Sequence, residues 1–145
     1  LREERENAKL ELDLIKNRST IQNIIKKFKL LDIRTSLFVN PSLKDIRISK
    51  AISADCVEIH TGKLSNLVKK RKNFSNELKR IKECSYLAND LGIEVHAGHG
   101  LDYKTTKILT SIKEIEEFNI GHFIIGESIF MGFKNVVKKF KTIIK

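Results

Sequence analysis

Residues 91–100 read Leu-Gly-Ile-Glu-Val-His-Ala-Gly-His-Gly, so a helix end, a strand and a glycine-bounded loop follow one another closely. Apolar residues recur at helical spacing over residues 75–91, and Gly92 is typical of the left-handed residue that ends a helix. The β-rich stretch at 93–97 starts directly after it. This segment therefore predicts a helix that runs into a strand, with a loop at the carboxyl end of that strand.

The same alternation extends in both directions along the chain. The patterns predict strands at 34–39, 56–60 and within 117–122, and helices at 19–31 (with Ser19 as the N-cap), 42–52, 103–112, 123–130 and 134–144. Such alternation produces right-handed crossovers and a parallel sheet with helices outside it. The four predicted strands are few for a doubly wound domain, and they equal half of an eight-stranded β/α barrel. A short helix after the last strand is characteristic of barrels that bind phosphate there.

Length and composition restrict the class of protein. The chain has 145 residues, of which 41% are hydrophobic and 32% charged, so we expect one globular domain over residues 1–145. Within it, residues 1–17 match the pattern poorly, and residues 18–145 form a helix followed by four β/α units. No apolar run reaches the roughly 18 residues of a membrane span. The chain is charged from Arg2 onward, so we expect no signal peptide, and its start at Leu1 indicates a processed or truncated chain.

Charge and cysteine content bear on partners and compartment. The formal net charge of +10 favours nucleic acid, acidic membranes or phosphorylated small molecules. Most of the excess is lysine spread along helical faces, and the chain has no Trp and two Tyr for stacking on bases. We therefore expect neither nucleic acid nor a membrane as a partner. Cys56 and Cys84 fit no disulfide or zinc-ribbon spacing, which favours reduced, buried thiols in a cytoplasmic protein.

All four histidines fall at or beside the ends of predicted strands, at positions 60, 96, 99 and 122. Because parallel α/β folds bind ligands at that edge of the sheet, we expect at least two of them to line one pocket. His99 stands between two glycines, and its imidazole suits proton transfer near neutral pH, although it could instead cap the backbone. His96 is expected to point outward between strand and helix. His60, His99 and His122 could also bind zinc, but no local spacing supports this.

Strand alternation puts Glu58 and His60 on the same face, opposite Val57 and Ile59. A carboxylate on an inner face is costly unless it is paired or functional, so Glu58 is a candidate catalytic residue. A structural ion pair with Lys or Arg is the alternative.

Gly121 and His122 open a segment whose helix N-terminus could hold phosphate, and a strand-ending turn with a packed histidine is the alternative. Basic residues 69–72 are expected in a long loop after the second strand. We interpret this loop as solvated, with a mobile, charged lid as the other possibility.

Four separated motifs resemble the pyridoxine 5′-phosphate synthase family of the vitamin B6 pathway. They are SLFV at 36–39, VEIHTG at 57–62, AGHGL at 97–101, and NIGH at 119–122 with IIG at 124–126. The resemblance covers about residues 30–145 and only the C-terminal half of the family's chain. It implies the C-terminal part of a TIM-type (β/α)8 barrel, about four β/α units with parallel strands and outer helices, in a homo-oligomer that is commonly an octamer.

The resemblance also implies a reaction and roles for particular residues. The family condenses 3-amino-2-oxopropyl phosphate with 1-deoxy-D-xylulose 5-phosphate to pyridoxine 5′-phosphate, phosphate and water, with no metal or organic cofactor. By motif, His99 is similar to the proton donor, and Glu58 to the carboxylate that stabilises a charged intermediate or transition state. Gly100, Gly121 and His122 are similar to contacts with the aminoketone phosphate.

The N-terminal part of the chain departs from the family. The family's proton-accepting His and Glu lie in its N-terminal half, and the resemblance of this chain does not extend to that half. Residues 5–14 resemble the segment after the family's fourth strand, but Lys9-Leu10-Glu11 replaces a Thr-Thr-Glu-Gly-Gly stretch, and residues 1–5 are also similar to the loop after its second strand. We therefore expect the chain alone to be weakly active or inactive. A non-catalytic half-barrel module for phosphate binding or assembly is the alternative function.

Overall fold

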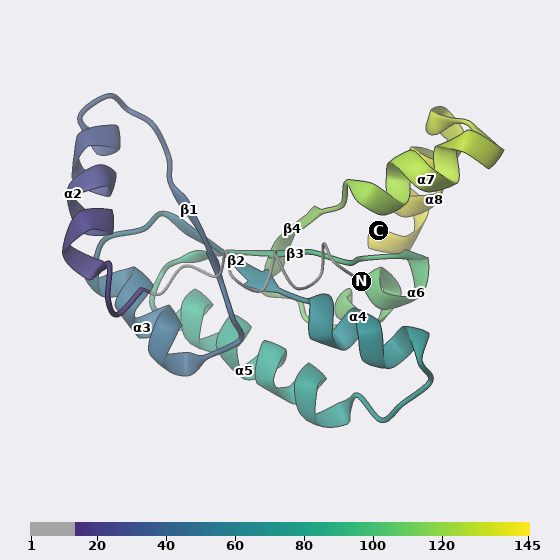
Figure 1. Cartoon of the computed structure of the whole chain (residues 1–145), viewed down its shortest axis with the longest axis horizontal. Coiled ribbons are helices and arrows are strands. Elements are labelled where there is room, and N and C mark those ends of the chain that lie inside the picture. Colours follow the sequence, from purple (N-terminus) through teal and green to yellow (C-terminus); the bar gives the residue numbers. More distant parts are fainter. Residues whose placement is uncertain (1–13) are drawn as a thin grey trace.

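A computed structural model of the chain describes residues 14–145 (Figure 1). The described residues contain a four-stranded sheet in the order β1-β2-β3-β4, and every neighbouring pair is parallel. Its strands are β1 (Ser36–Val39), β2 (Cys56–His60), β3 (Glu94–Gly98) and β4 (Ile115–Asn119). The predicted α/β alternation with parallel strands is confirmed.

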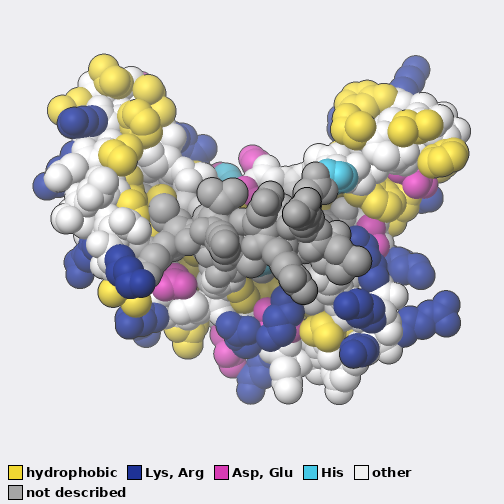
Figure 2. Space-filling view, viewed as in Figure 1, with side chains coloured by type: hydrophobic (Ala, Val, Ile, Leu, Met, Phe, Trp, Pro, Cys, Tyr) yellow, Lys and Arg dark blue, Asp and Glu magenta, His cyan; other side chains and the backbone are white. Residues whose placement is uncertain are grey.

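One helix precedes the first strand, four connect successive strands, and two follow the last strand in the described residues. They are α2 (Arg18–Lys29), α3 (Leu43–Ala51), α4 (Gly62–Lys69), α5 (Ser75–Asp90), α6 (Tyr103–Leu109), α7 (His122–Met131) and α8 (Phe133–Ile144). In Figure 1, α3, α4 and α5 lie on one side of the sheet, while α2 and the α7–α8 pair rise at its two ends. Figure 2 shows hydrophobic side chains gathered on both raised ends. Leu30, which directly follows α2, and Phe130 in α7 are each 86% exposed.

Strand alternation divides the sheet into an apolar and a polar face. Val57 and Ile59 of β2, and Val95 and Ala97 of β3, are buried in the core with residues from the helices. The residues between them, including Glu58, lie on the opposite face. The helices therefore cover the apolar face, and the polar face carries the chemically active side chains.

Local signals fix several helix boundaries. The Ser42 hydroxyl accepts a hydrogen bond from the Asp45 N–H at the start of α3, and the Asp102 carboxylate accepts one from the Thr105 N–H at the start of α6. Gly92 has φ of +68° just beyond α5, as its position predicted. Cys56 and Cys84 are free and buried, as expected, and burial raises the pKa of the Cys84 thiol to about 11.

Two predictions about local structure were wrong. Residues 62–69 form α4 rather than a polar loop, because Leu64 is fully buried and Val68 packs against the core at helical spacing. Lys69 is thus the last residue of a helix, whereas residues 70–72 lie in the loop between α4 and α5, as predicted. Helix α2 has Asn17 rather than Ser19 as its N-cap.

The expectations for residues 1–13 lie outside the described residues. In the part of the chain that the structure describes, no helix is long and apolar enough to cross a membrane.

Candidate functional site

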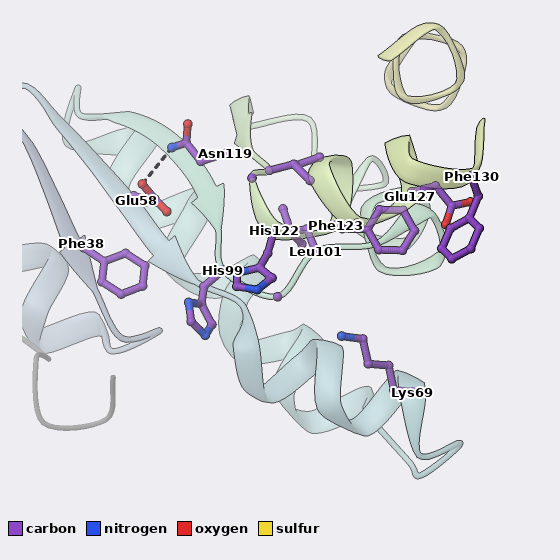
Figure 3. A pocket seen from close by; sticks show the side chains of 14 residues that line it. Phe38, Glu58, Lys69, His99, Leu101, Asn119, His122, Phe123, Glu127 and Phe130 are labelled. Carbon is purple, nitrogen blue, oxygen red and sulfur yellow. Dashed lines mark hydrogen bonds between the residues drawn. The ribbon is translucent and has the colours of Figure 1, made fainter. Parts of the chain in front are cut away.

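A pocket of about 870 Å³ lies at the carboxyl ends of the strands (Figure 3). Its lining comes from β1, β2, the end of α4, the loops that follow β3 and β4, and α7. His99 and His122 both line it, which confirms that at least two histidines share one pocket. Glu58, Gly100 and Gly121 line it as well, so all five sequence-predicted site residues lie around the same space.

The Glu58 carboxylate is held by an amide from two strands away. Asn119 Nδ2 donates a hydrogen bond of 2.8 Å to Glu58 Oε2. Gly98 of the intervening β3 pairs with Asn119, and a Cβ added to Gly98 would overlap the Glu58 carboxylate. The missing side chain at Gly98 therefore creates the space in which these two groups meet.

This environment changes the acidity of Glu58. Burial raises the pKa of its carboxyl above the ordinary 4.5, while the hydrogen bond from Asn119 opposes the rise by favouring the charged form. The alternative for Glu58, a structural ion pair with Lys or Arg, is not found among residues 14–145, where Asn119 is the hydrogen-bond partner of this carboxylate. A carboxylate held by a neutral amide keeps its negative charge available to stabilise a cation in the pocket.

The loop after β3 has an unusual backbone that presents His99. His99 has φ of +75° and Gly100 has φ of +72°, a left-handed region that a histidine rarely adopts. The fully buried Thr61 hydroxyl lies 2.7 Å from the Gly98 carbonyl oxygen and 2.9 Å from that of His99. The Thr61 hydroxyl can donate a hydrogen bond to either carbonyl oxygen, and this bond holds the loop after β3 against the end of β2. Strain of this kind is typical of functional sites.

Neighbouring rings fix the orientation of the His99 imidazole. The His60 ring lies 4.7 Å from it, and the Phe38 ring packs edge-on against His60 at 5.1 Å. A Cβ added to Gly62 would lie 2.7 Å from His99 Cδ2 and 2.9 Å from His60 Nε2. Gly62 therefore leaves room for both rings, and His60 supports His99.

The other end of the pocket combines a helix N-terminus with basic groups. Helix α7 begins at His122, with Gly121 as its N-cap. The expectation that His122 ends the fourth strand was wrong, because β4 ends at Asn119. Lys69 directs its ammonium group into the same pocket (Figure 3), and no ion pair involves it among residues 14–145. Free N–H groups at a helix start, together with a lysine, suit a phosphate group.

His96 does not lie where the sequence predicted. It occupies the polar face beside Glu58, is only 7% exposed, and has its Nε2 2.8 Å from Glu94 Oε1. The face toward the helices belongs to Val95 and Ala97, since alternation places His96 with Glu94. Among residues 14–145, the other three histidines belong to no group of three or more metal-ligating side chains, whereas ligand atoms of Cys56, Glu94 and His96 lie within 4.8 Å of one another.

Sequence reasoning missed Asn119 and Lys69 as site residues. Asn119 carried a usable signal, because it follows a predicted strand in the same motif as Gly121 and His122. Lys69 was missed because the sequence pattern placed it in a loop, whereas it is the last residue of α4. In contrast, the placement of Glu58 and His60 on one face is confirmed by the register of β2 and β3.

These features define an α/β protein with a parallel sheet whose candidate site lies at the carboxyl ends of the strands. The chain belongs to the family of the pyridoxal phosphate biosynthesis protein PdxJ, whose family model matches residues 2–145.

Curated relatives agree with this assignment. The chain is 61% identical over 132 residues to pyridoxine 5′-phosphate synthase of Pelagibacter ubique, a match that covers 91% of this chain and 55% of that protein. It is 38% identical to pyridoxine 5′-phosphate synthase of Campylobacter fetus, covering 99% of this chain and 64% of the relative. For the synthase of Zymomonas mobilis the identity is 40%, over 96% of this chain and 54% of the relative. The chain thus spans about half the length of the relatives it matches.

Proposed function

We propose that this chain is the C-terminal half of a pyridoxine 5′-phosphate synthase and supplies its proton donor and its aminoketone phosphate site. The observation that carries the proposal is the shared pocket, which is lined by Glu58 of β2, by His99 just after β3 and by His122 at the start of α7. The relatives named pyridoxine 5′-phosphate synthase support the substrate class.

The phosphate of 3-amino-2-oxopropyl phosphate binds at the start of α7. Gly121 offers an unobstructed approach, because no described atom lies within 4 Å of a Cβ added there. The first N–H groups of α7 and the His122 side chain donate to the phosphate oxygens, and Lys69 balances the charge from the opposite wall. Gly100 brings the loop backbone close to the same substrate.

The opposite end of the pocket carries the chemistry. His99 donates a proton to a leaving oxygen during the condensation, and the strained loop holds its imidazole toward the pocket. Glu58 stabilises the positive charge that develops on the amine-derived part of the intermediate. No step of this proposal requires a metal or organic cofactor.

The whole barrel and its assembly form part of the same proposal. Residues 18–145 form one domain, and β1 and β4 are the two outer strands of its sheet. Further strands from an N-terminal half complete a TIM-type barrel along these edges, as unpaired edges are a liability. The exposed apolar side chains on α2 and α7 support association into a homo-oligomer, in the cytoplasm.

A turnover assay tests the proposal. The purified chain is mixed with both phosphorylated substrates, with and without the N-terminal half of the Pelagibacter ubique synthase, and pyridoxine 5′-phosphate is followed by its absorbance. The chain alone is expected to be weak or inactive, and the mixture active. His99→Asn is expected to lower the rate of the mixture by about 10²- to 10⁴-fold, the range of general acid catalysis. Full activity of a His99→Asn mixture would contradict the assignment.

A non-catalytic phosphate-binding or assembly module is the second candidate, and the match to only 55% of the Pelagibacter ubique protein favours it. This module would bind phosphate compounds at α7 and show no turnover in either mixture. Phosphate binding combined with an inactive but assembled mixture would support the module over the enzyme.

A further inference from the structure

We propose that Cys56, Glu94 and His96 form a zinc-binding site on the polar face of the sheet, at the end opposite the pocket. Cys56 and Glu94 are the first residues of β2 and β3, whereas the pocket lies at the carboxyl ends of the strands. The site is independent of the proposed function, since it uses none of the residues assigned to substrate.

The backbone register brings the three ligands together. Cys56 pairs directly with Glu94, and His96 follows two residues later on the same face. The thiol sulfur, a carboxylate oxygen and a ring nitrogen lie within 4.8 Å of one another. Tetrahedral zinc needs separations of about 3.3–3.7 Å, given metal–ligand bonds of about 2.0–2.3 Å. Rotations of the three side chains, with the backbones of β2 and β3 unchanged, bring the ligand atoms to these separations.

The donor set selects zinc by its chemistry. One thiolate, one carboxylate and one neutral imidazole supply two negative charges, which balance a divalent cation. Sulfur and imidazole ligands favour zinc over magnesium or calcium, which prefer oxygen. A water molecule completes the four-coordinate shell.

Glu117 supplies the outer support that a metal-bound histidine requires. His96 Nε2 faces Glu94, and its other nitrogen, Nδ1, lies 3.8 Å from Glu117 Oε1. Histidines that bind a metal through one nitrogen usually donate the other N–H to a carboxylate, which fixes the ring orientation. The two ring nitrogens of His96 therefore face a ligand and a supporting carboxylate, respectively.

The cationic side chain of Arg34 already contacts two of the three proposed zinc ligands, Cys56 and Glu94. Its guanidinium donates to Cys56 Sγ at 3.2 Å and forms an ion pair with Glu94. The Arg34 side chain is 64% exposed, so it can swing into solvent when zinc binds. Arg34 and zinc thus compete for the same ligands, and loss of the guanidinium strengthens zinc binding.

Metal titration of the full chain tests this site. Zn²⁺ affinity is measured by calorimetry, and Co²⁺ is used as a spectroscopic probe because thiolate ligation gives a charge-transfer band. One equivalent is expected to bind with that band present. Cys56→Ser should abolish the band, while Cys84→Ser, at the other buried thiol, should retain it. His99→Asn should also retain it, which separates this site from the histidines of the pocket.

Two further variants test the supporting contacts. Arg34→Ala is expected to tighten zinc binding about two- to fivefold, the effect of one exposed like charge. Glu117→Gln is expected to weaken it about tenfold, as loss of an outer carboxylate does. Absence of the Co²⁺ band from the parent chain, or its persistence in Cys56→Ser, would overturn the proposal. Both of these results are independent of synthase activity.

Discussion

Asn119 holds the Glu58 carboxylate from two strands away, through a 2.8 Å hydrogen bond that passes over Gly98. The bond joins the end of β4 to the middle of β2, so the position of one charged group depends on three strands. It also ties Glu58 to the segment that leads into α7, where the phosphate is proposed to bind.

Loss of the Asn119 amide should make Glu58 a weaker acid. Asn119→Ala removes a donor that favours the ionised carboxylate and leaves the burial in place, so the pKa of Glu58 should rise further above 4.5. A carboxyl-detected NMR titration measures this pKa directly. Asn135→Ala removes an amide on α8 that donates to the carbonyl of Met131, the last residue of α7, and it should leave the Glu58 titration unchanged. An unchanged pKa in Asn119→Ala would show that the bond does not stabilise the charge.

Glu58 should make stability decrease with rising pH. Because its pKa is raised in the folded state, the folded chain binds the proton more tightly than the unfolded chain. Its contribution to stability is therefore lost as pH rises from 4.5 through the folded-state pKa. Glu58→Gln removes this effect, so its stability relative to the parent should increase over that interval. Urea unfolding at a series of pH values, with Glu116→Gln at an exposed site as control, measures it. Parallel curves for Glu58→Gln and the parent would refute the raised pKa.

A side chain at position 98 should disrupt the carboxylate site. Gly98→Ala places a Cβ on the Glu58 carboxylate, and such overpacking costs about 1–3 kcal/mol in the free energy of unfolding. Gly126→Ala in α7 meets no described atom within 4 Å and should be neutral or stabilising, by up to about 1 kcal/mol. Adding Glu58→Ala to Gly98→Ala should recover part of the loss. If the double variant is no more stable than Gly98→Ala, the added Cβ does not clash with the Glu58 carboxylate.

The Thr61 hydroxyl should matter for the His99 loop. Thr61→Val keeps the shape of the side chain but removes the donor to the Gly98 and His99 carbonyls, at a cost of about 1 kcal/mol. Thr142→Val is the matched control, because that hydroxyl bonds to a carbonyl on the exposed face of α8. Thermal unfolding measures both variants, and amide exchange of Gly100 reports on the loop. Equal effects of the two substitutions would contradict a special role for Thr61.

Much of the fold could be predicted from the sequence because its signals are local. Gly92 ends α5 through its own backbone freedom, and strand 56–60 is followed by Thr61 and Gly62 and alternates β-branched Val57 and Ile59 with other residues. Helix α4 was missed because it is short, with eight residues, and its lysines masked the apolar positions that pack on the core.

For the site, the sequence predicted only the face of the sheet on which its residues lie and the edge of the sheet at which they gather. The motifs identified Glu58 and His99, and the parity of β2 put Glu58 on the polar face. The cluster of Cys56, Glu94 and His96 could not be foreseen, because it depends on the register between two strands that lie far apart in sequence. The error for His96 has the same origin, since a strand sequence alone does not say which face the helices cover.

Direct binding of 3-amino-2-oxopropyl phosphate to the chain tests the central claim, that the pocket is the aminoketone phosphate site. Calorimetry should detect one binding site in the parent chain. His122→Asn should weaken it about tenfold to hundredfold, as loss of a hydrogen bond to a charged group does. Cys84→Ser should bind like the parent chain. A parent chain that does not bind the compound, or an unchanged affinity in His122→Asn, would contradict the account.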